Sequence, residues 1–332
     1  MTHLYVKEYT RHLLAHPLAV ACRESVLRDK FPAIIDDLKF LGRQGISTTF
    51  FHNLPPRSSN QKLVDDLARH LTGTQFVRIA SDVDFYEAVL NSDGVKFKLI
   101  FLERRPLLDQ KGERINTLTT ERYSSLPIEV NDVVQNVNFQ GALSQICEKI
   151  ESGACERIHI VPAGKATLRE ELFSVEGAGT MIANNFTEVF RAVDGAVEVK
   201  IVERILDMYK RSGYLKPRPK GYVTANRDHF FVTLIDGIIV GCVEQKDINE
   251  QTVELGALAI STRFRNQRIG VYTVNAFIEE MTTRGFTTFI SLTRNPRLQS
   301  LLSKMGFTRE KSRRYAAREA ISPGVPVYYK QN

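Results

Sequence analysis

The stretch ALAISTRFRNQRIGVYTVNAF, residues 257–277, decides how the second half of the chain is interpreted. It begins as an apolar, strand-like run, continues through arginines and glutamine around one glycine, and ends in apolar residues at helical spacing. The first N–H groups of a helix have no partner within the helix and lie at the positive end of its dipole. A basic turn that opens a helix therefore favours a bound anion such as a phosphate.

The segments on both sides of this stretch predict a compact α+β domain. Asp236-Gly237 between two β-rich runs is a strong hairpin signal, and Gly285 and Gly306 each follow a helical apolar pattern. In chain order we expect a helix within 197–213, a hairpin within 229–245, a strand at 253–261, a helix from the basic turn to Gly285, a strand at 287–292 and a short helix at 297–307.

The first half of the chain alternates helical and strand-like segments. Residues 31–51 and residues 141–161 each place apolar residues on one helical face, break at a glycine and continue into an apolar, β-rich run. This alternation predicts an α/β domain with helices on a largely parallel sheet, ending near residue 185. Residues 107–127 are polar and rich in turn formers, so we expect them to be a surface excursion.

Composition and charge limit the classes of function. The 332 residues suffice for two domains, and 45 Lys+Arg against 38 Asp+Glu give a net charge of +7 without a run of like charges. This favours anionic ligands and speaks against nucleic acid as a partner. Cys22, Cys147, Cys155 and Cys242 form no metal-binding or disulfide pattern, which predicts a reducing compartment and no metal. The sequence has neither a signal peptide nor an apolar run long enough for a membrane, so we expect a cytoplasmic protein.

Four features follow one another in the second half of the chain: ALAISTRFRNQRIG, an amphipathic helix, TTFISLTRN and LLSKMGF. In this order they resemble the GNAT acyltransferase superfamily over residues 187–310. In that family a central strand leads into a turn of the form Arg-x-x-Gly-x-Gly that cradles the pyrophosphate of acyl-CoA. Arg265 and Gly270 fit the first and last positions of the turn, whereas Arg268 stands where the family has its middle glycine. The alternative is an exposed basic turn above an ordinary core helix.

The resemblance implies that acetyl-CoA is the co-substrate. Its phosphates would lie on the turn and the helix start, and its pantetheine arm and acetyl oxygen on backbone amides of the splayed strand. The cofactor-binding residues that follow are Leu258, Ala259, Ile260, Arg265, Asn266, Gln267, Arg268, Ile269, Gly270 and Val271.

Two residues are candidates for proton transfer. Glu254 resembles the position at which several GNAT enzymes keep a general base, often acting through water; the alternative is an exposed strand glutamate. The usual tyrosine acid of the family would fall at Leu302, so it is absent. Thr293 or water would then protonate the departing thiolate, unless Thr293 only ends a strand.

The segments 30–56 and 157–182 resemble the beginning and end of the amino-acid kinase fold, as in acetylglutamate kinases and bacterial N-acetylglutamate synthases. In those synthases a GNAT domain follows directly. The fold class is therefore α/β and α+β, with a shortened, degenerate amino-acid kinase-like α/β sandwich at 1–185 and a GNAT acyltransferase domain at 186–332. Residues 19–27 and 51–56 lack the glycines of the phosphate turns, so we expect no ATP site and no kinase activity. The roles that remain for this first domain are a scaffold, a dimerisation surface or a binding site for an effector such as arginine.

The segment 205–223 resembles the synthase helix and loop that receive the carboxylate of glutamate. Arg218 matches an arginine of that loop, and Arg294 matches a Thr-Arg pair at a synthase strand end. A guanidinium group suits an amino-acid carboxylate, although either arginine alone could be a surface residue. The tail carries Arg313, Arg314 and Arg318 without the arginine–serine pattern of the synthases.

These resemblances together imply an acetyl-CoA-dependent N-acetyltransferase that acts on the α-amine of L-glutamate, in arginine biosynthesis. We expect a homo-oligomer with a small-molecule amine as substrate, and no nucleic acid or membrane partner. Two alternatives stay open. One is a GNAT enzyme for another amine, such as an amino acid, a polyamine or a protein lysine, and the other is a non-catalytic sensor of acetyl-CoA or an amino acid.

Overall fold

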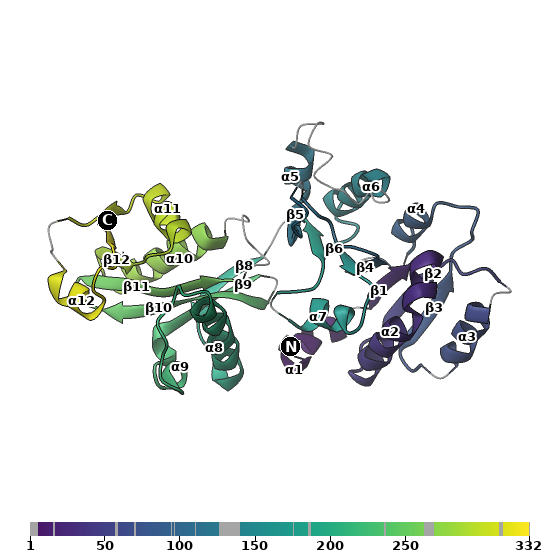
Figure 1. The fold of residues 1–332 in the computed structure, drawn as a ribbon, viewed down its shortest axis with the longest axis horizontal. Helices are drawn as coiled ribbons and strands as arrows, with labels where there is room; N and C mark the ends of the chain where they lie inside the picture. Colours follow the sequence, from purple (N-terminus) through teal and green to yellow (C-terminus); the bar gives the residue numbers. More distant parts are fainter. Residues whose placement is uncertain are drawn as a thin grey trace. The chain divides into compact units, whose positions relative to one another are not determined.

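The computed structural model describes most of the chain as two compact units, Met1–Phe186 and Thr187–Asn332. The described residues of each unit include a seven-stranded sheet (Figure 1). The ranges described are 6–15, 17–56, 59–69, 71–93, 95, 97–109, 111–125, 140–174, 176–184, 187–235, 237–261, 269–311 and 315–331.

The sheet of the first unit is largely parallel, as predicted, and has the order β3-β2-β1-β4-β6-β7-β5. Its first five strands in this order run parallel, β7 is antiparallel to β6, and β5 is parallel to β7. Central strands of this kind are buried on both faces, which explains why they are apolar runs without alternation. The strands are β1 (Leu18–Cys22), β2 (Thr48–His52), β3 (Thr74–Arg78), β4 (Lys98–Glu103), β5 (Thr117–Thr119), β6 (Arg157–Pro162) and β7 (Thr180–Ala183).

Helices cover both faces of this sheet (Figure 1). Helices α4 and α6 bury Phe85, Val89, Leu143 and Ile146 against strand residues such as Phe101. Helices α1, α2 and α7 pack together on the opposite face. The helix–strand units predicted at 31–51 and 141–161 are confirmed. The helices are α1 (Val6–Leu14), α2 (Glu24–Arg43), α3 (Ser59–Ala68), α4 (Phe85–Leu90), α5 (Thr120–Ser125), α6 (Gln140–Glu151) and α7 (Thr167–Phe173).

The prediction that residues 107–127 form a surface excursion was wrong. This segment contributes the edge strand β5 and the helix α5 to the fold. Leu118 is buried in the same core as α4 and α6. A strand of three residues is too short to give a periodic pattern, and its flanking polar residues hide it.

The sheet of the second unit begins with an antiparallel meander. Its order is β13-β14-β12-β11-β10-β9-β8, in which β8 to β11 are antiparallel neighbours, β12 runs parallel to β11, and β14 returns antiparallel to β12. The strands are β8 (Glu188–Ala192), β9 (Phe230–Ile235), β10 (Ile238–Asp247), β11 (Thr252–Ile260), β12 (Thr288–Leu292), β13 (Thr308–Arg309) and β14 (Val327–Gln331).

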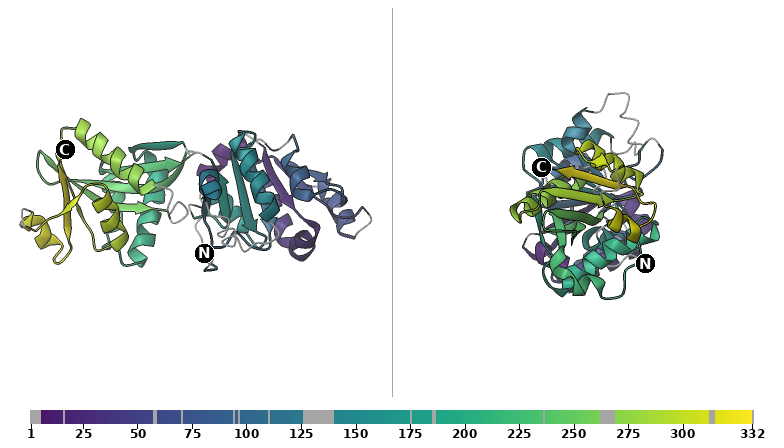
Figure 2. Two further views of the ribbon diagram at one scale, coloured as in Figure 1. Left: turned by 90° about the horizontal axis from the view of Figure 1, so that it is seen from above. Right: turned by 90° about the vertical axis from the view of Figure 1, so that its left-hand side faces the viewer.

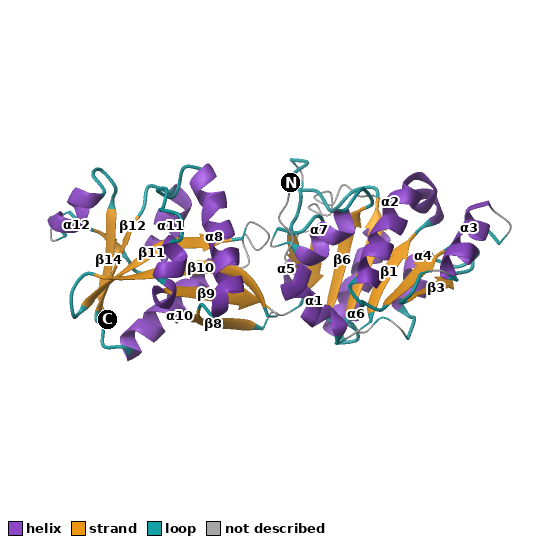
Figure 3. Cartoon of the chain, turned by 90° about the horizontal axis from the view of Figure 1, so that it is seen from below, coloured by secondary structure: helices purple, strands orange, loops and turns teal. Residues whose placement is uncertain are grey.

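Two layers of helices enclose this second sheet. Helices α10 and α11 share a core with Val243, Leu255 and Phe289. They lie over one face of the sheet (Figure 1, and from above in Figure 2), whereas α8 crosses β10 and β11 on the other face (Figure 3). The predicted order of helices, hairpin and strands is confirmed, with Asp236 of the hairpin turn outside the described residues. The helices are α8 (Gly195–Arg211), α9 (Tyr222–Ala225), the 3-10 helix η3 (Arg227–His229), α10 (Ile269–Thr283), α11 (Pro296–Lys304) and α12 (Ala316–Ile321). Within the described ranges, none of the helices combines the length and apolarity needed to cross a membrane.

Candidate active site

Strands β11 and β12 separate part of the way along their length. They pair at Thr252–Thr288, Val253–Phe289 and Glu254–Ile290, and the ladder ends there. Beyond this point Ser291 Oγ still donates to the carbonyl of Leu255 at 3.0 Å, while β12 continues beside β14. We refer to the region beyond Glu254, where the two parallel strands no longer pair, as the V, with its vertex at Glu254.

A bulge in β11 follows the vertex. Partners change from Glu244–Gly256 to Cys242–Ala259, so two steps along β10 oppose three steps along β11. Ala257 lies inside the bulge with φ of 49°, a left-handed conformation that costs a non-glycine residue about 1–2 kcal/mol. Bulges re-aim the backbone groups after them, and local strain of this kind gathers at functional sites. Nothing in the sequence indicates it, because the residue is an alanine.

The backbone after the bulge points alternately to the two sides of β11. Ser261 N–H donates to Val240 O at 2.6 Å on the β10 side. Ile260 points to the other side, where its N–H donates to the hydroxyl of Tyr209 at 3.3 Å and its carbonyl accepts from that hydroxyl at 2.7 Å. By this alternation the amides of Leu258 and Ile260 lie away from β10, and that of Ala259 lies toward it. Tyr209 lies in the helix predicted within 197–213, and no sequence pattern indicated this contact.

The start of α10 is close to α11. A Cβ atom on Gly270 would lie 3.1 Å from Leu301 Cδ2, so close packing against α11 also favours a glycine at this position. Ile269 is buried, and its carbonyl accepts from Thr273 Oγ1 at 2.8 Å; Val271 is half-buried. Arg265, Asn266, Gln267 and Arg268, the predicted phosphate turn, lie outside the described residues.

Two glutamates lie on the sheet face opposite α10. Val243, Val253 and Leu255 face α10, so alternation places Glu244 and Glu254 on the side of α8 and α9. Both glutamates are buried, with 1% and 3% of their surface exposed. A buried carboxylate needs partners, and each of these has an arginine.

Glu244 is bound by three donors. Arg218 Nη2 lies 2.5 Å from its Oε2, Tyr222 OH 2.5 Å from its Oε1, and Lys246 Nζ 3.4 Å from Oε2. The guanidinium of Arg218 also lies 5.5 Å from the centre of the Tyr222 ring. Burial and the bond to Glu244 raise the pKa of Tyr222 to about 12. Arg218, the predicted partner of a substrate carboxylate, is thus held by a carboxylate of the chain itself.

Glu254 is bound by Arg318 of α12. Arg318 Nη2 lies 2.7 Å from Glu254 Oε1, and Arg318 Nε donates to Oε2. Each carboxylate oxygen has two lone-pair directions, so this fork leaves room for one further donor, such as a water, on each oxygen. The alternative of an exposed strand glutamate is excluded by its burial.

The C-terminal segment joins the loop that carries Arg218. Ser322 Oγ accepts from Arg318 Nη1 at 3.1 Å and from Lys216 Nζ at 3.2 Å, and Lys216 also donates to Ile321 O at 3.0 Å. The sequence interpretation found no arginine–serine pattern in the tail. Arg318 and Ser322, one helical turn apart, nevertheless meet at this face, which the i to i+4 spacing on a short helix could have suggested.

Thr293 and Arg294 occupy the link from β12 to α11. Thr293 is buried; its Oγ1 accepts from Asn295 N–H at 3.0 Å and its N–H donates to Pro326 O at 3.1 Å. Arg294 is exposed and donates to Pro323 O at 2.8 Å. Both residues thus help fasten the segment before β14 to the end of β12. Among the residues that the structure describes, no cluster of His, Cys, Asp and Glu could hold a metal ion.

The carboxyl ends of the strands in the first unit are occupied by the chain's own side chains. Arg23, after β1, makes a fork with Glu103 of β4 at 3.1 and 2.6 Å, and Tyr86 OH donates to Glu103 at 2.8 Å. The first N–H of α2, that of Glu24, donates to Asn53 Oδ1 at 2.6 Å.

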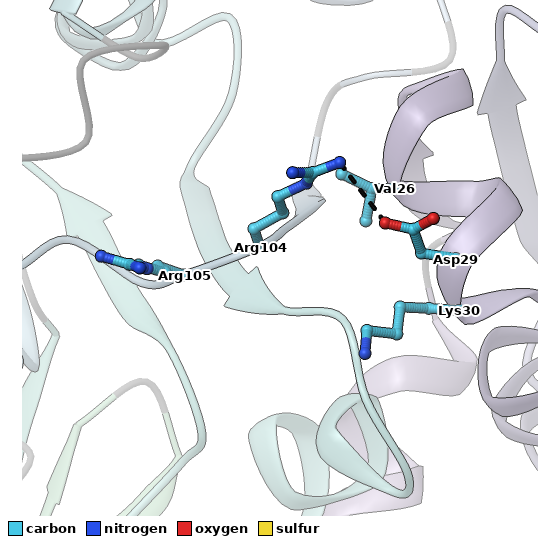
Figure 4. A pocket seen from close by; sticks show the side chains of 5 residues that line it. All are labelled: Val26, Asp29, Lys30, Arg104 and Arg105. Atoms are coloured by element: carbon cyan, nitrogen blue, oxygen red, sulfur yellow. Dashed lines mark hydrogen bonds and ion pairs between the residues drawn. The ribbon is translucent and has the colours of Figure 1, made fainter.

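A cavity of about 280 Å³ lies beside this group, between the start of α2 and the end of β4 (Figure 4). Its lining includes an exposed ion pair, in which Arg104 Nη2 lies 3.3 Å from Asp29 Oδ2. The other lining residues are Val26, Lys30 and Arg105.

Comparisons with known proteins relate the chain to acetyltransferases. Residues 177–307 match the acetyltransferase (GNAT) family model. The amino-acid acetyltransferase of Aeromonas salmonicida is 27% identical over 238 residues, which cover 70% of this chain and 52% of the relative. That of Shewanella oneidensis is 23% identical over 242 residues with the same coverage. The chain spans about half the length of these relatives.

A solved structure has a similar fold. The N-acetylglutamate synthase of Neisseria gonorrhoeae, complexed with coenzyme A and L-arginine, superposes with a TM-score of 0.52 at 13% identity, over 98% of this chain and 97% of the synthase chain. At this identity the likeness concerns the fold. Residues 177–307 therefore match the acetyltransferase (GNAT) family model, and they follow in sequence an N-terminal α/β domain, in a chain whose fold is similar to that of this N-acetylglutamate synthase.

Proposed function

We propose that this chain transfers the acetyl group of acetyl-CoA to the α-amine of an amino acid, with L-glutamate as the acceptor. The observation that carries the proposal is the parting of β11 and β12 at Glu254, followed by the bulged strand that leads to the start of α10. A similar chain is named amino-acid acetyltransferase, which supports an amino acid as the acceptor.

In this proposal the acetyl-CoA thioester lies in the V between the two strands. The N–H groups of Leu258 and Ile260 face this gap and are candidates to hold the pantetheine arm and the oxygen that becomes negative during attack. Ile260 then exchanges its bond with Tyr209 for one with the ligand. The turn 265–268 and the first residues of α10, Ile269 to Val271, would receive the phosphates.

Proton transfer is proposed for two side chains near the V. The neutral amine attacks the thioester, and Glu254 at the vertex accepts the amine proton through a water on a lone pair that Arg318 leaves open. Thr293 Oγ1 accepts one hydrogen bond, so its own O–H can donate to the departing thiolate and pass on a proton that it regains from a water. Leu302, where the family tyrosine would fall, is fully buried in the core and offers no proton.

Arg218 and Arg294 are the proposed partners of the acceptor carboxylates. The first unit is proposed to act as a scaffold or regulator. An amino-acid effector such as arginine is suggested by the arginine-bound synthase of similar fold. A homo-oligomer without nucleic acid remains the expected assembly.

One observation favours a second candidate, a sensor that binds acetyl-CoA without turnover. Arg218 and Arg318, on the sheet face opposite α10, are already bound by Glu244 and Glu254, and Glu254 is the proposed base. A sensor would keep these pairs intact when its ligand binds.

The deciding experiment follows CoA release with a thiol reagent while the acceptor is varied over amino acids and polyamines. The four cysteines are buried, and burial raises the pKa of Cys147 and Cys242 to about 12, so the folded protein contributes little thiol signal. Turnover with glutamate, lost in Gly270→Glu, supports the proposal. Turnover only with another amine would identify that amine, and not glutamate, as the acceptor. Binding of acetyl-CoA without any turnover favours the sensor.

A further inference from the structure

The contacts of Glu244 carry an inference that rests on the proposed function and sharpens its acceptor. Three donors surround this carboxylate: the Arg218 guanidinium, the Tyr222 hydroxyl and the Lys246 ammonium. A guanidinium together with a hydroxyl and an ammonium is also a donor set that can bind a free carboxylate ligand. Here the carboxylate belongs to the strand β10 itself.

Exposure differs sharply within this group. The side chain of Glu244 is 2% exposed, whereas those of Arg218 and Lys246 are 19% and 32% exposed. Glu244 therefore lies beneath its cations, and a ligand from solvent would meet Arg218 and Lys246 first. Glu254 and its partner Arg318 lie on the same face, and Glu244 also acts electrostatically on Arg318.

A carboxylate of the acceptor has two ways to reach Arg218. It can displace Glu244, which leaves a buried carboxylate with fewer partners, or it can share the guanidinium with Glu244, which brings two like charges close together. Both ways weaken the binding of an acidic acceptor, whereas an acceptor with a neutral side chain avoids the conflict at this position.

We infer that Glu244 is a specificity-determining residue, an internal carboxylate that competes with the acceptor carboxylate for Arg218 and so sets the preference between acidic and neutral amino acids. The opposite role would be to orient Arg218 for the acceptor. The two roles predict changes of opposite sign when the charge of Glu244 is removed.

The test uses Glu244→Gln, which keeps the shape of the side chain, and compares two acceptors of nearly equal size, glutamate and glutamine. The ratio of kcat/KM for glutamate to that for glutamine should rise at least about tenfold, a factor that one removed like-charge contact readily supplies. The change should come from the KM for glutamate, with the KM for acetyl-CoA unchanged. A fall in the ratio, or no change, overturns the inference.

Two further variants serve as controls for this experiment. Glu280→Gln removes another glutamate–arginine pair, Glu280–Arg284 on α10, and should leave the ratio unchanged. Glu244→Asp keeps the charge but withdraws it from Arg218, and should move the ratio in the same direction by a smaller factor. It also serves if Glu244→Gln does not fold, which far-UV circular dichroism would reveal.

A calorimetric readout separates this inference from the proposed function. If no amino acid is turned over, the proposed function fails, and glutamate and glutamine are titrated into the CoA-bound protein instead. An increase of about tenfold in the affinity for glutamate relative to glutamine in Glu244→Gln supports the role of Glu244 in a binding site. The inference is overturned if the ratio of the two affinities is unchanged, or if neither glutamate nor glutamine binds to either protein.

Discussion

Replacing Arg318 by methionine should destabilise the second unit through Glu254. The substitution keeps an unbranched side chain but leaves a carboxylate that is only 3% exposed without its fork. Removing one partner of a fully buried pair costs about 3–5 kcal/mol. Arg318 itself is 15% exposed, so water can reach part of the space, and we expect a loss of about 2–3 kcal/mol in the free energy of unfolding.

A double-mutant cycle checks this magnitude. The chain has no tryptophan, so urea unfolding is followed by far-UV circular dichroism. Glu254→Gln combined with Arg318→Met should recover most of the loss, because the double variant buries no unpaired charge. A loss below about 0.5 kcal/mol in Arg318→Met, with no coupling between the sites, would show that the pair behaves as a surface contact and would refute the reasoning.

Three further predictions concern other parts of the chain. Gly270→Glu should abolish acetyl-CoA binding in calorimetry, because a carboxylate would face the phosphates. Gly270→Ala should still bind, because its Cβ meets only the flexible end of Leu301. Equal affinities of the two variants for acetyl-CoA would show that Gly270 is not part of the binding site. Burial lowers the pKa of His52 to about 4, below its ordinary 6.5, so its contribution to stability is present above pH 6.5 and is lost as the pH falls toward 4. His52→Gln should remove about 2 kcal/mol of that pH dependence in urea titrations at pH 4.5 and 7, and an unchanged slope would contradict the burial argument. Tyr209→Phe should tighten acetyl-CoA binding severalfold if the Ile260 amide must leave the hydroxyl to bind the ligand; weaker binding would mean that Tyr209 contacts the ligand itself.

Most elements of the fold could be predicted because their patterns are local. The apolar stripe of α10 and the glycines that end α10 and α11 are readable within one segment. The glycines at 285 and 306 indeed have φ of 98° and 85°. The strand β5 escaped prediction because a partner far along the chain, β7, stabilises it.

Candidate site residues could be named from sequence but their interactions could not. Glu254 and Arg218 were named because they resemble family positions in a strand and a loop. Their partners lie 64 and 26 positions away, at Arg318 and Glu244, and no local rule connects such positions. The bulge at Ala257 was equally hidden, because tertiary pairing with β10 imposes a conformation that alanine does not prefer.

The gap between β11 and β12 gives the second sheet an internal edge. Proteins cover or shorten sheet edges, because an open edge recruits any extended chain that carries amides. From Gly256 to Ile260, beyond the bond from Ser291 to the Leu255 carbonyl, the side of β11 turned away from β10 is such an edge, and Tyr209 binds Ile260 near its end. In deuterium exchange, the Leu258 amide should exchange quickly in the free protein and slowly once a ligand with its own amide groups lies along the strand. The same edge makes the unliganded domain the form most exposed to strand-to-strand association between copies of the chain.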